Sequence, residues 1–242
     1  MRNGILHASY FDPDAKNLAY VNVTAGTSRT VDSGTNSGWH SSIAITASGV
    51  PAISYYDKEE LKYGSFGTPA WSVNTLDQAR SVPEGFSLAA DASGAMHATW
   101  VDTLQQHLRY ARQNGTNWQI ISVAGGATAD TSLKLSSNGY PRVTFYNSVS
   151  NVLRYCAFLK RNVDSTWKTE TVDTGGGFDN SLAIANDDWS WISYGAGGNL
   201  KCAYQNTNGW NLLTVDNTTG GTFLAPRLPW HPTARLRSPT AA

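Results

Sequence analysis

Charged side chains are scarce in this chain of 242 residues. Eighteen Lys and Arg and eighteen Asp and Glu make up 15% of the sequence and leave a formal net charge of zero, whereas globular domains average about 25% charged residues. Without a basic excess, the chain lacks the field that attracts nucleic acid or an anionic membrane surface. It also lacks a run of about 18 apolar residues, the length of a membrane span. We therefore expect neither a nucleic-acid partner nor a transmembrane segment.

Cysteine is almost missing as well. Cys156 and Cys202 are too few for a disulfide framework and lack the spacing of a metal-binding motif, so we expect buried free thiols, no metal and no cofactor. Residues 1–4 run directly into a predicted strand without an apolar leader. The Ser-, Thr-, Asn-, Gly- and Trp-rich, Lys-poor composition is nevertheless typical of exported bacterial proteins, which suggests an extracellular location.

Glycine and aromatic residues are abundant, and they recur in a repeat of about 45 residues. Each copy opens with a hydroxyl residue and an apolar run, as at Ser42–Ile45, Ser87–Ala90, Ser132–Leu135 and Ser181–Ile184. A turn follows, which contains Ser-Gly or Asn-Gly in most copies, and such turns are typical of tight hairpins.

Three further columns of the repeat predict three more strands in each copy. A second strand carries an aromatic residue, a third carries Leu-x-Tyr, and a fourth opens on Trp. The aromatic column is Tyr10, Tyr55, Trp100, Phe145 and Tyr194, and the tryptophans are Trp71, Trp118, Trp167 and Trp210. Four antiparallel strands per copy are typical of a propeller blade. The sequence therefore predicts an all-β, five-bladed β-propeller over residues 1–225.

The two ends of the chain complement each other in this repeat. The first copy lacks its first strand, while Thr222–Ala225 has the first-strand pattern after the last copy. The final strand is therefore predicted to complete the first blade and close the ring, which would hide two sheet edges. The alternative is that Thr222 opens a sixth blade. Residues 226–242 contain four prolines and three arginines without an acid, and we expect a disordered tail or one that docks on a partner.

The string Ser-Ile-Ala-Ile…Ile-Ser-Tyr-Tyr-Asp…Leu-Lys-Tyr-Gly…Trp at residues 42–71 resembles a propeller repeat of bacterial secreted and surface proteins. This resemblance covers roughly residues 4–225, and most of those proteins have no assigned activity. More distantly, the ring is similar to sugar-binding propeller lectins, including five-bladed ones. The resemblance implies the fold and makes a glycan or small-molecule ligand an expectation. The sialidase motif Ser-x-Asp-x-Gly-x-x-Trp does not fit residues 91–100.

Acidic side chains recur where the second and fourth predicted strands end. The second strands end on Asp12, Asp57, Asp102 and Asn147, and the fourth on Asp32, Asp77, Asp173 and Asp216. In propellers these ends share one face, where ligands usually bind, so we expect an acidic loop face. The alternative is that these carboxylates accept backbone N–H groups within turns.

The positions where the copies differ are better candidates for a ligand site than the positions that repeat. Aromatic residues precede several first strands beside polar groups, an arrangement that suits a sugar ring. The predicted ligand-binding residues are Trp39, His40, Asp57, Phe86, Asp102, Asn147, Phe178 and Asp179. The alternative for the three aromatic residues is that they fill gaps between blades.

One column of the second strand also varies, through His7, Ala52, His97, Arg142 and Trp191. Its histidines lack a third ligand and do not predict a metal site.

The leading hypothesis from the sequence is a non-catalytic, lectin-like binding module that uses the acidic loop face or the gaps between blades. The second is a glycoside hydrolase that uses Asp130 and Asp179, or Asp12, Asp57 and Asp102, because glycosidases pair two carboxylates. The third is a protein-interaction scaffold or a fragment of a larger surface protein. The pattern gives no indication of the oligomeric state.

Overall fold

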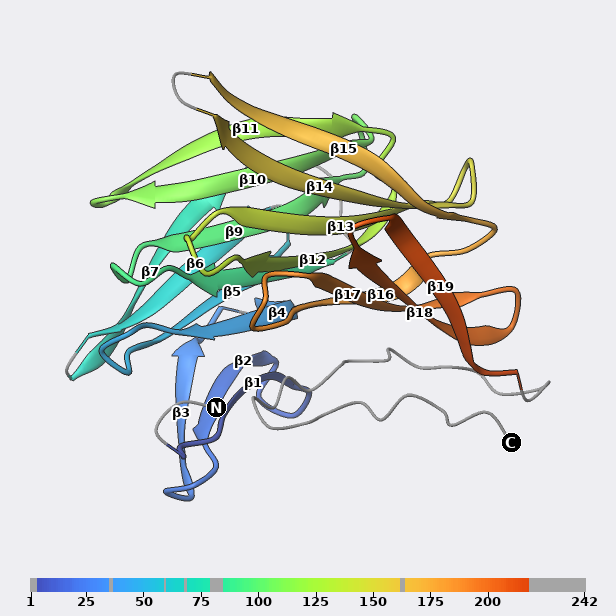
Figure 1. Cartoon of the computed structure of the whole chain (residues 1–242). Coiled ribbons are helices and arrows are strands. Elements are labelled where there is room, and N and C mark those ends of the chain that lie inside the picture. The colour runs from blue at the N-terminus through green and yellow to red at the C-terminus, as the bar shows by residue number, and fades with distance from the viewer. Residues whose placement is uncertain are drawn as a thin grey trace.

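The computed structural model describes residues 4–34, 37–58, 60–67, 69–78, 85–161 and 164–217. The predicted closing strand at 222–225 and the tail at 226–242 lie outside these ranges. In these ranges every regular secondary-structure element is a β-strand. The strands form five antiparallel sheets that follow one another along the chain (Figure 1). The all-β prediction is confirmed for this part of the chain.

The five sheets follow the predicted repeat closely. Sheet 1 contains β1 (His7–Asp12), β2 (Asn17–Asn22) and β3 (Thr27–Asp32). Sheet 2 contains β4 (Ser37–Ile45), β5 (Pro51–Asp57), β6 (Glu60–Gly67) and β7 (Ala70–Asp77). Sheet 3 contains β8 (Phe86–Ala90), β9 (Met96–Asp102), β10 (His107–Asn114) and β11 (Asn117–Gly125). Sheet 4 contains β12 (Ala129–Leu135), β13 (Pro141–Asn147), β14 (Val152–Arg161) and β15 (Asp164–Thr174). Sheet 5 contains β16 (Phe178–Ile184), β17 (Ser190–Ala196), β18 (Asn199–Asn206) and β19 (Gly209–Asp216).

The first strands of the sheets lie innermost and touch one another in sequence. β4 contacts β8, β8 contacts β12, and β12 contacts β16, while β1 lies against β4. The last strand of each sheet lies at the periphery, as β3, β7, β11, β15 and β19 show in Figure 1. The sheets therefore follow one another around a common centre.

A hydroxyl group joins each inner strand to the next, and it is the serine that opens the repeat. Each serine Oγ accepts the N–H of the leucine one repeat later, and the distances are 3.1, 2.9 and 3.0 Å. The pairs are Ser42 with Leu88, Ser87 with Leu133, and Ser132 with Leu182. The repeated serine thus satisfies an inner-strand N–H group that pairing within its own sheet leaves free.

Farther out, aromatic rings hold neighbouring sheets together. The tyrosine of each third strand meets the tryptophan of the next sheet edge to face, with ring centroids 5.0 to 5.3 Å apart. The pairs are Tyr20 with Trp71, Tyr63 with Trp118, Tyr110 with Trp167, and Tyr155 with Trp210. Buried apolar clusters span the same four junctions, from sheets 1 and 2 to sheets 4 and 5. Cys156 and Cys202 are buried free thiols within this packing.

Sheets 5 and 1 differ, because no buried apolar cluster of the described residues joins them. Tyr10 is 43% exposed, although Tyr55 at the same place in sheet 2 is fully buried. Val215 is 60% exposed, although its counterpart Val172 is 6% exposed. Sheet 1 also has three strands rather than four, so β1 is an edge strand within the described part of the chain.

The serine contact predicts a specific loss of stability. Ser87→Ala leaves the N–H of the fully buried Leu133 without its acceptor, and we expect the free energy of unfolding to fall by about 1 to 3 kcal/mol. Denaturant titration measures this change. Ser72→Ala, at an exposed position on β7, is the control and should change stability by less than about 0.5 kcal/mol. Equal losses of unfolding free energy in the two variants would show that the Ser87 hydroxyl does not stabilise the contact between neighbouring inner strands.

Candidate functional site

Two of the aspartates that end the fourth strands, Asp32 and Asp173, have structural partners in the next sheet. Asp32 Oδ2 accepts the Tyr55 hydroxyl at 2.5 Å and the Lys62 Nζ at 3.4 Å. Asp173 Oδ2 accepts Tyr194 at 2.8 Å and Lys201 at 3.0 Å in the same way. Burial acts to raise the pKa of Asp32, but the Tyr55 and Gly34 hydrogen bonds and the Lys62 charge lower it below its ordinary value. These two carboxylates therefore join sheets.

The acidic residues that end the second strands mostly close turns. Asp102 Oδ1 accepts the N–H of Gln105, and Asn147 Oδ1 accepts that of Ser150, each at 3.0 Å. Asp12 holds its turn in the same way. Asp57 is buried and forms an ion pair with Lys62. Asp12, Asp102 and Asn147 therefore accept backbone N–H groups within turns, as the alternative interpretation predicts. Asp57 is buried and does not lie on an open loop face.

A polar cavity of about 630 Å³ at the inner strands collects His40, Phe86 and Asp179, which the sequence had singled out, together with Asp130. His40, Asp130 and Asp179 have φ values of 52°, 45° and 52° at the same place in the repeat, where sheet 3 has Gly85. The register of the first strands slips at these bulges. Non-glycine residues rarely adopt this conformation, and such bulges often redirect side chains at binding sites.

The remaining aromatic residues of the predicted set bridge neighbouring sheets. Trp39 stacks on Phe11 of sheet 1 at 4.6 Å between ring centroids, and it is 48% exposed. Phe178 meets Tyr146 of sheet 4 edge to face at 6.5 Å. Both rings thus occupy gaps between sheets, and the structure does not gather the eight predicted residues into one pocket.

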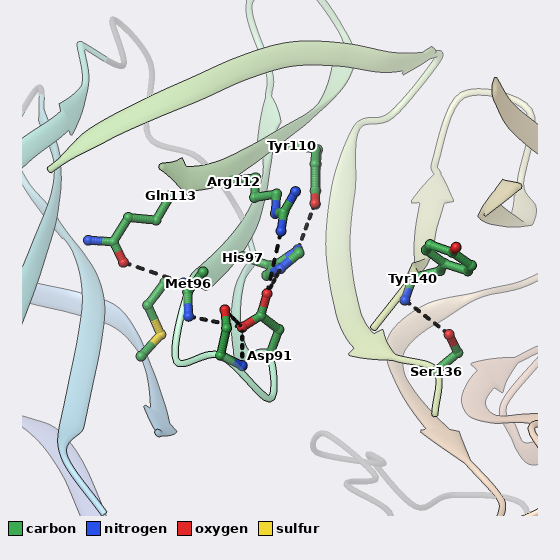
Figure 2. Close-up of polar contacts among 10 residues, drawn as sticks. Asp91, Met96, His97, Tyr110, Arg112, Gln113, Ser136 and Tyr140 are labelled. Atoms are coloured by element: carbon green, nitrogen blue, oxygen red, sulfur yellow. Dashed lines mark hydrogen bonds and ion pairs between the residues drawn. The ribbon is translucent and has the colours of Figure 1, made fainter. Parts of the chain in front are cut away.

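A different pocket, of about 420 Å³, opens in the groove between sheets 3 and 4. Figure 2 shows His97 and Arg112 on one side of this groove and Tyr140 on the other. Sheet 3 contributes a polar wall of Asp91, His97, Tyr110 and Arg112. Sheet 4 contributes an aromatic wall, Tyr140, Phe158 and Trp167. We call this pocket the 3/4 groove.

Hydrogen bonds fix the polar wall of the 3/4 groove. His97 Nδ1 lies 2.6 Å from the Tyr110 hydroxyl, and His97 Nε2 lies 3.4 Å from Asp91 Oδ2. Because an ionised carboxylate only accepts hydrogen bonds, Nε2 carries the proton and Nδ1 accepts the hydroxyl of Tyr110. Burial lowers the pKa of His97 despite the opposing effect of Asp91. Arg112 Nη2 approaches the same Asp91 oxygen at 3.6 Å and is more than half exposed.

Asp91 reaches the groove because it opens the tight turn between β8 and β9. Its Oδ1 accepts the N–H of Ser93 at 2.9 Å and that of Ala95 at 3.0 Å. Thr46 and Ser136 occupy the same place in sheets 2 and 4 and accept the equivalent N–H through a hydroxyl. Asp91 therefore replaces a turn-closing hydroxyl and brings a second oxygen to His97.

The aromatic wall is a continuous set of rings. Tyr140 and Phe158 are 6.0 Å apart between centroids, and Phe158 and Trp167 are 5.6 Å apart. Ile121 is partly exposed at the rim. Apolar rings opposite fixed donors and acceptors suit a ligand with one apolar face and several hydroxyl groups.

Two other sheet junctions also place a polar residue of this column against the tyrosine hydroxyl. His7 Nδ1 lies 2.6 Å from the Tyr20 hydroxyl, and Arg142 donates to the Tyr155 hydroxyl at 3.1 Å. Trp191 instead stacks on Tyr204. The sequence identified this variable column but not its partners. The register of β9 and β10 places His97 opposite Arg112. A sequence alignment of the two strands in this register could have identified Arg112 as a neighbour of His97.

The described residues contain neither a cluster of metal ligands nor a helix that could span a membrane. No group of three or more His, Cys, Asp or Glu side chains among them could hold a metal ion. No helix in the same part of the chain has the length and apolar character required to cross a membrane.

No family model and no curated protein matches this chain. Solved structures are similar in fold. A triple-arginine mutant of AofleA from Arthrobotrys oligospora has 12% identity and a TM-score of 0.62, over 89% of this chain and 70% of that one. A Hadza microbial sialidase has 12% identity and a TM-score of 0.55, over 79% and 49%. An ulvan lyase bound to -[GlcA(1-4)Rha3S]- has 12% identity and a TM-score of 0.52, over 88% and 69%.

Identities this low indicate the fold alone. The five successive antiparallel sheets and these structural neighbours together support a β-propeller. The chain spans about half the length of the sialidase.

The buried His97 predicts a pH dependence of stability. The pKa of His97 in the folded protein lies below the ordinary value of 6.5. As the pH falls, the unfolded chain therefore binds a proton at this histidine more readily than the folded protein does. The stabilisation that neutral, buried His97 contributes is complete above pH 6.5 and is lost at lower pH. His97→Gln should therefore reduce the loss of unfolding free energy between pH 7.5 and about pH 5. Denaturant titrations at both pH values test this, and equal slopes for the variant and the wild type would contradict it.

Proposed function

We propose that this protein is a non-catalytic carbohydrate-binding module, lectin-like in action, with its ligand in the 3/4 groove. The observation that carries the proposal is the fixed His97–Asp91–Arg112 cluster opposite the rings of Phe158 and Trp167. The groove volume of about 420 Å³ lies within the range of small-molecule sites. The carbohydrate-related names of structural neighbours, a sialidase and an ulvan lyase, fit this class of ligand.

Each wall of the groove has a part in this proposal. The C–H face of a sugar ring would lie on Phe158 or Trp167, where burial of apolar area favours binding. The guanidinium of Arg112 would donate to the hydroxyls on the other side, since it is exposed and Asp91 engages only part of it. Among the described residues that line the groove, Asp91 is the one carboxylate, whereas glycoside hydrolysis normally requires a pair. This difference favours binding over catalysis.

The inner cavity supports the second candidate function, a glycoside hydrolase. Asp179 donates its backbone N–H to Asp130 Oδ2 at 2.8 Å, so the two acidic residues lie together in a polar cavity. The hydrolase hypothesis requires two carboxylates in one cavity, and these two residues supply them. The predicted ligand residues His40 and Phe86 line the same cavity and would contact a substrate there.

We further infer that the propeller is a five-bladed ring closed by residues 222–225, which lie outside the described part of the chain. Within the described residues, β1 is an edge strand without the first-strand partner that every other sheet has. The exposed Tyr10 and Val215 occupy places that are buried at the other junctions. Closure would cover both, and Thr222 would stand where Ser42 stands in sheet 2. A second copy of the chain that covers these residues instead is the scaffold alternative.

Binding measurements test the carbohydrate proposal. In a glycan-array screen followed by calorimetry, we expect Arg112→Gln to weaken the best ligand about tenfold or more, because a charge-assisted hydrogen bond contributes about 1.5 to 3 kcal/mol. Phe158→Ala should weaken it through loss of ring contact.

Arg154→Gln is the matched control, because Arg154 lies on β14, bonds Thr171 and does not line the groove. Full binding by both groove variants would exclude the 3/4 groove as the site. Glycoside turnover that disappears in Asp130→Asn would support the hydrolase instead.

Amide hydrogen exchange tests the ring closure. If residues 222–225 pair with β1, the amides of His7–Asp12 on the edge opposite β2 are slow to exchange in the full chain. Leu224→Pro should speed them, because proline cannot join the ladder, whereas Leu236→Pro in the tail should leave them unchanged. Fast exchange in the wild type, or no effect of Leu224→Pro, would contradict closure. Concentration-dependent protection would indicate a second copy.

A further inference from the structure

A second groove, between sheets 4 and 5, encloses about 800 Å³. Arg142 and Tyr155 of sheet 4 line it, together with Trp189 and Gln205 of sheet 5. Arg142 stands at the place in the repeat that His97 occupies in the 3/4 groove. We call this second pocket the 4/5 groove.

Neutral hydroxyl groups surround the guanidinium of Arg142. Its Nη1 donates to the Tyr155 hydroxyl at 3.1 Å and to Ser190 Oγ at 3.4 Å. These two hydroxyls lie 2.9 Å apart and bond to each other. The ion pairs found among the described residues do not include Arg142. The guanidinium is therefore oriented without being neutralised.

The two acids that line the 4/5 groove are engaged elsewhere. Glu170 pairs with Lys168 at 2.5 Å and accepts the indole N–H of Trp210 at 3.1 Å. Asp188 accepts the backbone N–H of Ser137 at 2.8 Å and its hydroxyl at 2.5 Å. The Ser137 hydrogen bonds, with a smaller contribution from the Arg142 charge, hold the pKa of Asp188 below its ordinary value. Asp188 thus attracts Arg142 at a distance without bonding to it.

Two substitutions within the repeat separate this groove from the 3/4 groove. Ser136 closes the turn where sheet 3 has Asp91, so the acid that faces His97 has no counterpart beside Arg142. Ala157 follows the tyrosine of the third strand where sheet 3 has Arg112, and it lines the groove. The 4/5 groove is therefore larger, and Arg142 has no ion-pair partner among the described residues, whereas His97 at the same place in the repeat pairs with Asp91.

A partly buried guanidinium without a counterion favours an anionic ligand. Arginine remains charged at all relevant pH values, and its planar fork matches the two oxygens of a carboxylate. Burial removes part of the hydration of the Arg142 guanidinium, which costs free energy. The charge of a carboxylate would offset this cost, whereas a neutral hydroxyl would offset only part of it. Tyr140, Phe158 and Trp189 line the same groove and provide apolar rings for the rest of the ligand.

We propose that the 4/5 groove is a second ligand site, selective for saccharides that carry a carboxylate, which Arg142 binds. The proposal shares the ligand class of the proposed function, and Tyr140, Phe158 and Trp167 line both grooves, but its charged residue is Arg142 rather than Arg112. The chain would then present neighbouring grooves of different selectivity, one for neutral sugar hydroxyls and one for an acidic sugar.

NMR titration of the full-length protein with glucuronic acid and with glucose tests the selectivity. These probes differ at C6, where one has a carboxylate and the other a hydroxymethyl group. We expect glucuronic acid to shift signals of Ser190, Trp189 and Tyr155, and to bind at least about tenfold more tightly than glucose in this groove. Its affinity should fall as salt is added, since a partly exposed charge pair is screened. N-acetylglucosamine 6-sulfate distinguishes a carboxylate site from a general anion site.

Arg142→Gln should remove the preference for glucuronic acid, and Arg142→Lys should retain part of it because the charge remains. Arg112→Gln is the cross-control and should leave glucuronic acid binding in the 4/5 groove unchanged. Equal affinities for glucuronic acid and glucose in the wild type would overturn the proposal, and so would an unchanged preference in Arg142→Gln. Tighter binding of the sulfate than of the uronate would overturn its carboxylate selectivity.

The two proposals fail separately. If Arg112→Gln leaves all saccharide binding intact while Arg142→Gln abolishes uronate binding, the 3/4 groove is not a site and the 4/5 groove is. If neutral saccharides bind through Arg112 and uronate shows no dependence on Arg142, the reverse holds. A thermal melt of each variant confirms that it is folded before it is titrated.

Discussion

The contact between one sheet and the next is the constraint on which the rest of this structure depends. A four-stranded sheet of this size cannot bury its faces alone, so each one relies on its neighbours. Tyr110 against Trp167 illustrates how that contact is made, and the serine of each inner strand fixes the spacing at the centre. Because the same residues recur, the sheets meet in the same way at four successive junctions.

The grooves are a consequence of this packing. The tyrosine ring is buried between sheets, while its hydroxyl reaches the residue of the variable second-strand column. The frame is therefore constant, and one or two substitutions change its chemistry. Asp91 and Arg112 surround His97 with charge, whereas Ser136 and Ala157 at the equivalent places bring no charged group to Arg142. Stability and recognition occupy different positions of the repeat, so recognition can vary from groove to groove while the fold is preserved.

Much of the fold was predictable because period and turn chemistry are local properties. The Ser-Gly and Asn-Gly turns, the Leu-x-Tyr strands and the tryptophan column locate nearly every strand that the structure contains. The site was less predictable. The sequence predicts Trp39 and Phe178 as ligand residues because they precede first strands, and in the structure each packs on an aromatic ring of a neighbouring sheet. The sequence predicts Asp57 as a ligand residue for its charge, and in the structure Asp57 forms an ion pair with Lys62. Which aromatic or acidic side chain is satisfied by a neighbour depends on contacts between repeats.

The sequence by itself determined the strands, the repeat and the absence of a strong net charge, because hairpins and alternation are set by residues close together in the chain. It also showed which column varies. Only the tertiary structure decided which residues share a groove, since His97 and Phe158 belong to different sheets and meet through the angle at which those sheets pack. It also decided that Arg142 forms no ion pair among the described residues, whereas His97 pairs with Asp91. Burial and counterions are properties of the folded surroundings, and they turn a variable column into candidate sites.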